Sequence, residues 1–277
     1  MNIVKHMKVK PGTKVKLKGI DPGYTASHAK SADAEDHLQR NIEKMTALQE
    51  LLYVEKKHAL LIVLQGIDAA GKDGTCWHVL RAMNPQGTRV TGFKQPTSEE
   101  REHDFLWRIH QHTPGLGEVA VFNRSHYEDV LVARVHDLVP KATWSQRYDL
   151  INSFEAGLHL KGTVILKFFL WISPDEQLKR FRRRLEDPAK QWKISEADYT
   201  ERERWDDYIK AYEAMLSKCS TDFAPWYVVP ANHKWFRNLA VSEVIVETLS
   251  KLKMKPPPPT VDIEDIRQKY HDAAASA

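Results

Sequence analysis

One stretch constrains this chain more than any other: the apolar run LLIVL at residues 60–64, which leads through Gln65 into the glycine-bracketed loop GIDAAGK. A short, uninterrupted apolar run is typical of a strand buried on both faces of a parallel sheet. Residues 66–72 match the spacing G-x-x-x-x-G-K, in which backbone N–H groups surround a phosphate chain and the lysine neutralises it. A simple glycine-rich turn is the alternative. The strand before the loop and the helix predicted at residues 75–83 favour a phosphate site at a helix N-terminus.

The residue after the loop lysine departs from this pattern. A Ser or Thr at that position usually holds Mg²⁺ through its hydroxyl, whereas this chain has Asp73. A carboxylate beside bound phosphate is unfavourable unless a cation intervenes or the side chain turns away. Metal binding must therefore come from other residues, and Asp68, inside the loop, is the first candidate.

Strand and helix patterns alternate along the rest of the chain. Further strands are predicted at residues 88–93, 118–122, 163–172 and 226–230, and helices at 34–56, 98–112, 144–160, 174–186 and 235–251. This order predicts a three-layer α/β/α fold around a mostly parallel five-stranded sheet. Right-handed crossovers place the carboxyl ends of the strands at one rim, where open sheets bind ligands. We expect the following side chains to meet there: Asp68, Lys72, Lys94, Asn123 and Arg124.

Length and composition fit one such domain with appendages, because 277 residues can bury a sizeable core. We expect an extended arm at residues 1–32, the domain at 33–252 and a Pro-rich tail at 253–277. The two cysteines are isolated, no signal peptide is recognised, and the longest apolar run, residues 164–172, is too short to span a bilayer. These features predict a cytoplasmic protein without a membrane partner.

Basic residues are concentrated between positions 179 and 193, a stretch that contains seven Lys and Arg residues and only two acidic ones. A solvated helical face is the ordinary explanation of such a run. Its position after the fourth strand favours a lid at about residues 180–198, because kinases of this fold carry an arginine-bearing lid over the transferring phosphate. Other conspicuous residues are assigned structural roles: the histidines lack metal-ligand spacing. The helical stripe of Trp205, Tyr208, Tyr212 and Met215 is predicted to face the core.

Three segments taken together resemble one family. The loop GIDAAGKDG, the segment FNRSHYEDV with Arg134 downstream, and the segment DPAKQWKI occur in the order typical of the polyphosphate kinase 2 family, and the resemblance spans about residues 38–252. It implies a thymidylate kinase-like P-loop fold and phosphoryl transfer between inorganic polyphosphate and a nucleotide with Mg²⁺, or Mn²⁺ as an alternative. It also implies a homo-oligomer, either dimer or tetramer. No nucleic-acid partner is expected, because no aromatic-rich recognition motif accompanies the basic segment.

The resemblance further implies roles for individual residues. Asp68 and Lys72 would hold metal and donor phosphate, Glu128 would supply a second metal carboxylate, and Asn123 would orient a phosphate or a metal-bound water. The remaining loop contacts to the donor would come from Gly66, Ala69, Ala70, Gly71, Asp73, Gly74 and Thr75. Acceptor phosphates would be held by Arg124 and Arg134, with Lys94 at the rim. The lid residues on the polyphosphate chain would be Arg180, Arg184, Lys190 and Lys193.

Many members of the family have aspartate where this chain has Asn123, which leaves no carboxylate base at that position. An acceptor phosphate needs none, because the second pKa of a phosphomonoester is about 6 and the group is already ionised near pH 7. Asp73 and Glu128 resemble the subgroup that phosphorylates both AMP and ADP, with ATP as product. Two other functions stay open: a nucleoside monophosphate kinase that uses ATP, and a non-catalytic protein that binds polyanions.

Overall fold

The computed structural model describes residues 3–26, 31–81 and 83–276, and its centre is a single five-stranded sheet. The strands are β1 Ala59–Gln65, β2 Thr88–Gly92, β3 Val119–Asn123, β4 Thr163–Trp171 and β5 Trp226–Pro230. Their order is β2-β3-β1-β4-β5, and every neighbouring pair is parallel. The predicted α/β class and the five strands are confirmed, each strand to within one residue at either end.

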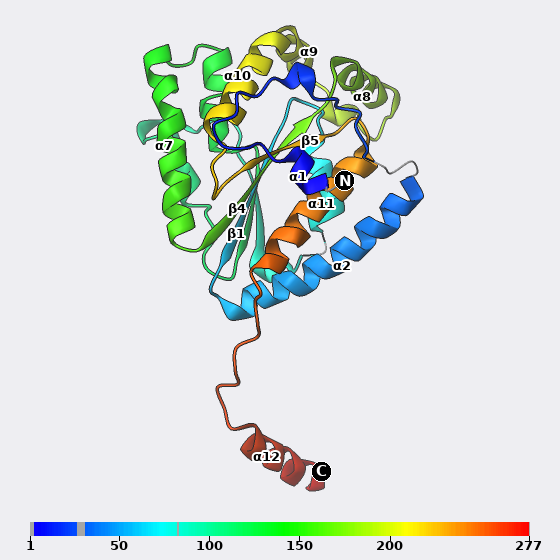
Figure 1. Cartoon of the computed structure of the whole chain (residues 1–277), viewed down its shortest axis with the longest axis vertical. Coiled ribbons are helices and arrows are strands. Elements are labelled where there is room, and N and C mark those ends of the chain that lie inside the picture. The colour runs from blue at the N-terminus through cyan, green and yellow to red at the C-terminus, as the bar shows by residue number, and fades with distance from the viewer. Residues whose placement is uncertain (1–2, 27–30, 82, 277) are drawn as a thin grey trace.

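β1 is the middle strand, and its side chains supply both hydrophobic cores. Leu60, Ile62 and Leu64 point to one face, and Leu61 and Val63 point to the other, as the two-residue period of a strand requires. Helices α2 Ser31–Glu55 and α11 Lys234–Lys251 cover the first face. Helices α7 Lys141–Leu160 and α10 Trp205–Lys218 cover the second (Figure 1). Burial on both faces, at about 1.5–3 kcal/mol for each large apolar side chain, holds the strand before the glycine loop in place.

The prediction of a single helix at residues 98–112 is wrong. Thr97 forms a capping box with Glu100, as the sequence suggests, but α4 stops at Ser98–Glu102 and α5 resumes only at Trp107–His110. The side chain of Asp104 accepts a hydrogen bond from the N–H of Leu106 at 2.9 Å. Such local side-chain bonds compete with helical ones, and they explain the break. The helix after the loop also begins earlier than expected, with α3 at Lys72–Thr75 followed by the π-helical turn Cys76–Leu80.

The N-terminal segment is packed on the body and is partly helical. Residues Ile3–Met7 form α1, with Val4 and Met7 buried against the sheet side that carries α11. Lys8 forms an isolated antiparallel bridge with Tyr227 of β5, and Ile20 accepts a hydrogen bond from the indole N–H of Trp171. Residues 27–30, which belong to the expected arm, lie outside the described part of the chain.

The C-terminal segment leaves the body through the four prolines at 256–259 and ends in helix α12, Ile263–Ala275. Figure 1 shows α12 standing away from the sheet and its helices, and each of its residues is exposed. Among the described residues, no helix combines the length and the apolar character needed to cross a membrane.

Candidate active site

The glycine loop follows β1 and curls around the amino end of α3. Gly71 has φ +107°, and Ala69 has φ +64°, a left-handed conformation that a side chain disfavours and that clusters at functional sites. The ammonium of Lys72 donates to the carbonyl of Gly66 across the loop at 2.7 Å. Burial, and after it the charge of Arg124, lowers the pKa of Lys72. The lysine is therefore held inside the loop, where an anion would stabilise its charged form.

Arg180 binds the backbone carbonyls of this loop. One guanidinium nitrogen donates to the carbonyls of Ala69 and Ala70 at 2.8 and 2.9 Å, and the other donates to Ala231 and Asn232. Its Nε pairs with Glu176 at 2.8 Å. The side chain is 6% exposed, and the structure places it under the loop, not on the expected lid surface. Its role here is to fix the loop backbone.

The segment after β3 brings a second cation to the loop. Arg124 has φ +62°, held by a hydrogen bond from its N–H to the carbonyl of Leu64 in β1. Its guanidinium donates to the Asp68 carboxylate at 2.8 Å, with both side chains partly exposed at 43% and 30%. Ion pairs with this exposure contribute little to stability, commonly about 0–1 kcal/mol. A bound phosphate or cation can therefore replace this pair at low cost.

Asp73 and Asn123 face each other beside the loop. The Asn123 amide donates to Oδ1 of Asp73 at 2.7 Å, so the carboxylate after Lys72 turns towards β3. An aspartate at 123 would set two carboxylates at hydrogen-bond distance, which is unfavourable unless one binds a proton or a cation. The two departures noted in the sequence thus compensate one another in the structure.

Glu128 lies in the short 3₁₀ turn His126–Asp129, which follows Arg124 in the chain. Ser125 caps the turn by accepting from the N–H of Tyr127 and receives a bond from Gln65 at the end of β1. Burial raises the pKa of the Glu128 carboxyl, although nearby Arg124 and Lys72 work to lower it. A cation bound beside this half-buried carboxyl would stabilise its charged form.

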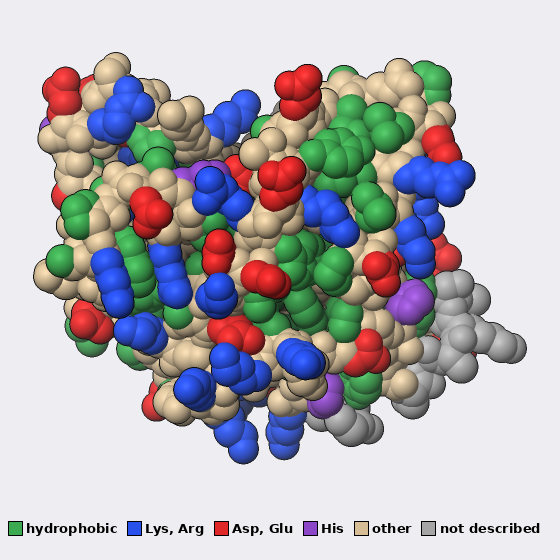
Figure 2. Space-filling view, turned by 90° about the horizontal axis from the view of Figure 1, so that it is seen from above, with side chains coloured by type: hydrophobic (Ala, Val, Ile, Leu, Met, Phe, Trp, Pro, Cys, Tyr) green, Lys and Arg blue, Asp and Glu red, His purple; other side chains and the backbone are tan. Residues whose placement is uncertain are grey.

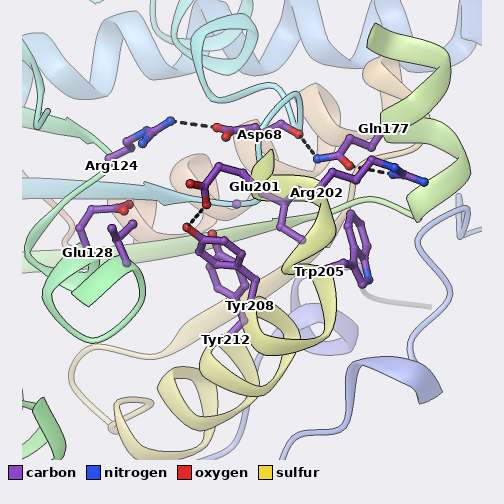
Figure 3. Close-up of a pocket in the computed structure, with 12 residues that line it drawn as sticks. Asp68, Arg124, Glu128, Gln177, Glu201, Arg202, Trp205, Tyr208 and Tyr212 are labelled. Atoms are coloured by element: carbon purple, nitrogen blue, oxygen red, sulfur yellow. Dashed lines mark hydrogen bonds and ion pairs between the residues drawn. The ribbon is translucent and has the colours of Figure 1, made fainter. Parts of the chain in front are cut away.

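Asp68, Arg124 and Glu128 line one pocket at the rim, and helices α8 (Pro174–Glu186), α9 (Glu196–Glu203) and α10 close it (Figure 3). Its lining residues are Gly66, Ile67, Asp68, Arg124, Glu128, Val132, Gln177, Glu201, Arg202, Trp205, Tyr208 and Tyr212. Figure 2, seen from above, shows acidic and basic side chains intermixed around a central group of hydrophobic ones on this side of the molecule. The site therefore offers both charged and apolar contacts to a ligand.

The aromatic wall of this pocket corrects one expectation. Met215 is buried as predicted, but Trp205, Tyr208 and Tyr212 line the pocket instead of serving only the core. Tyr208 donates its hydroxyl to Glu201 at 2.6 Å. Trp205 and Tyr212 are seven positions apart and so lie on the same face of the helix, which borders both the core and the pocket. A pattern of apolar positions cannot tell which of these two environments each residue faces.

Further polar pocket residues were missed by sequence reasoning. The Gln177 amide donates to the carbonyl of Asp68 at 3.0 Å, and its oxygen accepts from Arg202 at 2.9 Å. These bonds connect α8 and α9 to the glycine loop (Figure 3). A sequence signal exists only in part, because Gln177 lies one helical turn from the cap at Ser173 and Arg202 is one of many charged residues.

The expected lid segment, residues 180–198, comprises the second half of α8, a connection with the 3₁₀ turn Gln191–Lys193, and the start of α9. Arg184 donates to the carbonyl of Lys193 at 3.2 Å and lies 3.4 Å from the carboxylate of Asp198. Lys190 pairs with Asp187, and the Lys193 ammonium lies 4.9 Å from the ring centre of exposed Trp192. The arginine therefore ties the two sides of the segment together, and the lysines lie on its exposed surface.

Lys94, expected at the rim, and Arg134, expected on the acceptor phosphates, do not line the pocket. Lys94 follows β2 with an exposed side chain, and its carbonyl accepts from Arg108 at 2.8 Å. Arg134 stacks on Trp144 at 4.7 Å and donates to the Tyr148 hydroxyl at 3.3 Å. Of the five side chains expected to meet at the rim, Asp68 and Arg124 pair directly and line the pocket. Lys72 and Asn123 lie beside them, with hydrogen bonds to Gly66 and Asp73 respectively.

The carboxylates of the pocket fit a magnesium ion that binds together with a substrate phosphate. Within the described ranges, no group of three or more His, Cys, Asp or Glu residues could hold a metal by itself. Mg²⁺ is commonly held by one or two carboxylates together with substrate phosphates and water. Asp68 and Glu128 supply such a pair of carboxylates in one pocket.

Comparison with known proteins gives matches over almost the whole chain. The model of the family described as polyphosphate kinase 2 matches residues 28–257. The AMP/ADP-polyphosphate phosphotransferase of Meiothermus ruber is 49% identical over 267 residues, covering 95% of this chain and 99% of that protein. The ADP-polyphosphate phosphotransferase of Rhodopseudomonas palustris is 45% identical, covering 92% and 93%.

The fold has an equally extensive match. The crystal structure of polyphosphate kinase 2 from Arthrobacter aurescens TC1 superposes with a TM-score of 0.94 at 42% identity, covering 98% of this chain and 97% of that one. The likeness therefore includes the segments that build the pocket as well as the glycine loop.

Proposed function

The chain belongs to the polyphosphate kinase 2 family, and from this premise we propose that it transfers a phosphoryl group reversibly between inorganic polyphosphate and the adenine nucleotides AMP and ADP. One observation carries the proposal. Asp68 of the glycine loop, Arg124 after β3 and Glu128 lie in a single pocket, next to the loop that holds Lys72. Donor-binding and acceptor-binding groups are thus adjacent, as direct transfer requires.

The donor end of the chain would lie on the glycine loop. Backbone N–H groups between Gly66 and Thr75 and the ammonium of Lys72 would hold its terminal phosphates. Asp68 and Glu128 would hold Mg²⁺, which when bound supplies positive charge to the phosphate oxygens. Phosphoryl transfer places negative charge on peripheral oxygens in a loose transition state, so positioning and cationic stabilisation account for most of the catalysis.

The acceptor would occupy the pocket with its phosphate on Arg124. That arginine would exchange its half-exposed partner Asp68 for the nucleotide phosphate, a charge-assisted contact that Arg makes well. The acceptor oxygen attacks the terminal phosphorus, and the bond to the next bridging oxygen of polyphosphate breaks. Because the acceptor phosphate is ionised near neutral pH, Asn123 would only have to orient it and would not have to remove a proton.

The aromatic wall suits the nucleoside part of such an acceptor. Trp205 and Tyr208 give flat apolar surfaces at the pocket edge, and base–aromatic stacking is worth about 1–3 kcal/mol per base. The lid segment, with Arg184, Lys190 and Lys193, would close over the donor and bring positive charge to the transferring group. Acceptance of both AMP and ADP is proposed because the Meiothermus ruber relative carries both in its name.

The test is product formation from AMP and, separately, from ADP, with Mg²⁺ and long-chain polyphosphate as the only donor. ADP followed by ATP from AMP supports the dual-acceptor function. Product from ADP alone would keep the polyphosphate donor and remove AMP as acceptor. If neither gives product and ATP phosphorylates AMP, the nucleoside monophosphate kinase is the better assignment.

A further inference from the structure

The N-terminal arm is hydrogen-bonded to α10, the helix that carries the aromatic wall of the acceptor pocket. The carboxylate of Glu213 accepts from the backbone N–H of Leu17 at 3.0 Å. One helical turn further on, the hydroxyl of Ser217 accepts from the backbone N–H of Val15 at 2.9 Å. Figure 1 shows this part of the arm, in blue, passing beside α10. Two side chains of the helix therefore hold the backbone of the arm.

The arm also packs into the core behind the pocket wall. Leu17 is fully buried and Val15 is 7% exposed, and both belong to the same hydrophobic core as Tyr212 of the wall. Tyr212 directly precedes Glu213 in the sequence. Because a helix turns by about 100° per residue, these neighbours point in different directions, so α10 presents Glu213 to the arm and Tyr212 to the pocket.

The next residues of the arm reach the strand ends beside the site. The carbonyl of Ile20 accepts from the indole N–H of Trp171, the last residue of β4, at 2.9 Å. The ring of Trp171 lies 6.2 Å from the ring of Trp205 in the pocket wall. The carbonyl of Pro22 accepts from the N–H of Asn232, two residues after β5, at 3.1 Å. The arm therefore contacts both the wall helix and a neighbour of Trp205.

The bond to Glu213 is the strongest of these polar contacts. Its acceptor is a carboxylate, and hydrogen bonds with one charged partner are about twice as strong as neutral ones. The Glu213 side chain is only 14% exposed, so water has little access to it. Without this carboxylate, the N–H of buried Leu17 would lose its acceptor, and an unpaired buried N–H is costly. The arm would then no longer be held in its place on α10.

We propose that Glu213 is a positioning residue for the acceptor: by holding the arm on α10, it fixes Trp205 and Tyr208 where the nucleoside binds (Figure 3). Glu213 does not line the pocket, so it acts through the helix and not by contact with substrate. The glycine loop is held separately, through the carbonyls that bind Arg180, so donor binding should not depend on the arm. This inference rests on the proposed function, which places the acceptor base on the aromatic wall.

The test compares Glu213→Ala, Glu213→Gln and Ser217→Ala with the parent. Asp207→Ala is the matched control, because Asp207 is an exposed carboxylate of the same helix that pairs with Lys210 and not with the arm. Lys16→Gln is a second control, because it removes only the exposed ammonium that also pairs with Glu213 at 2.6 Å. For each protein, Tm, kcat and the KM values for AMP and for polyphosphate are measured.

Glu213→Ala should raise KM for AMP about fivefold or more, because a displaced wall stacks less well on the base, with KM for polyphosphate unchanged. Glu213→Gln should restore KM for AMP to nearly the parent value, because its amide oxygen still accepts from the N–H of Leu17. Ser217→Ala should raise KM for AMP about threefold, because it removes a neutral and weaker hydrogen bond. Asp207→Ala and Lys16→Gln should behave like the parent, because exposed ion pairs contribute little.

Equal increases in KM for AMP and polyphosphate, or a lower Tm with both KM values unchanged, would make Glu213 a structural residue only and overturn the inference. A Gln variant as impaired as the Ala variant would also overturn it, because the bond to Leu17 would then not be the cause. If Glu213→Ala does not fold, Ser217→Ala carries the comparison, and an unchanged KM for AMP in that variant contradicts the inference.

Turnover by the parent separates these results from failure of the proposed function. If the parent phosphorylates AMP from polyphosphate and every variant has the parent's KM for AMP, only the role of Glu213 is wrong. If the parent transfers no phosphoryl group from polyphosphate to AMP or ADP, the proposed function is wrong and the positioning role falls with it.

Discussion

Replacing Lys167 by methionine should destabilise the protein strongly, because it leaves a carboxylate buried without its counter-charge. Lys167 in β4 is fully buried, and its ammonium donates to Glu155 at 2.5 Å, to the Tyr127 hydroxyl at 2.9 Å and to the Cys219 carbonyl at 2.6 Å. Glu155 is also fully buried and accepts from Tyr127 at 2.7 Å. This network anchors the residues between Arg124 and Glu128, so it fixes the acceptor side of the site.

The magnitude follows from the burial of both charges. Removing one partner of a buried ion pair costs about 3–5 kcal/mol. For a domain of this size, about 2–4 °C of Tm accompanies each kcal/mol, so a fall of about 6–20 °C is expected. Lys210→Met, which removes an exposed lysine paired with Asp207, should cost less than about 1 kcal/mol and serves as the matched control.

The cost should depend on pH with a defined sign. In the parent, burial works to raise the pKa of Glu155, but Lys167 and His126 outweigh it and lower the pKa below its usual value. This carboxylate therefore contributes stability above its unfolded pKa of about 4.3, which is lost as pH falls through the lower folded pKa. Without Lys167, burial raises the pKa, so the deficit of Lys167→Met should be largest near pH 8 and shrink as pH falls towards 5.

Thermal unfolding of Lys167→Met, of Glu155→Leu and of the double variant Lys167→Met/Glu155→Leu, each at pH 8 and pH 5, tests this reasoning. The double variant should be at least about 2 kcal/mol more stable than the sum of the single losses predicts, because no unpaired charge remains. Strictly additive losses, or a deficit that is the same at pH 8 and pH 5, would refute the assignment of the energy to the ion pair.

Three further predictions concern the proposed reaction. Lys72→Ala should lower kcat about 100-fold or more with circular dichroism unchanged, because the developing charge loses a fixed cation; retained turnover would remove the loop from the mechanism. Arg184→Ala should raise KM for polyphosphate about tenfold and weaken its salt dependence, and an unchanged chain-length and salt profile would count against the lid. Trp205→Leu should raise KM for AMP about tenfold while KM for polyphosphate stays constant, and the reverse pattern would exclude base stacking on this wall.

The sheet was predictable because its strands are short apolar runs whose burial leaves few alternatives. β1 is buried at every position, and the turn residues around β2 bound it on both sides. The single helix expected at residues 98–112 failed because Asp104 makes a local hydrogen bond that periodicity does not register. The N-terminal segment looked extended from its Pro and Gly residues, yet its apolar residues Val4 and Met7 find partners only in the folded body.

The site was predictable where residues lie directly after a strand. Asp68 and Lys72 follow β1, Asn123 is the last residue of β3 and Arg124 follows it, and parallel pairing brings those strand ends together. Gln177 could not be found in this way, because it is 109 residues from Asp68 in the sequence and reaches that residue's carbonyl only in the packed fold. Arg180 was assigned to the lid by the family resemblance, whereas its burial, and hence its contacts with the loop carbonyls, is a property of the packed fold.

The most direct test of the central claim follows the phosphorus atom from polyphosphate to nucleotide. Polyphosphate labelled with ³²P at its ends is mixed with AMP, Mg²⁺ and either the parent or Lys72→Ala, with no ATP present. The account predicts rapid appearance of label in the β-phosphate of ADP with the parent and a rate at least about 100-fold lower with the variant. Label that stays in polyphosphate, or reaches ADP equally fast without Lys72, would contradict it.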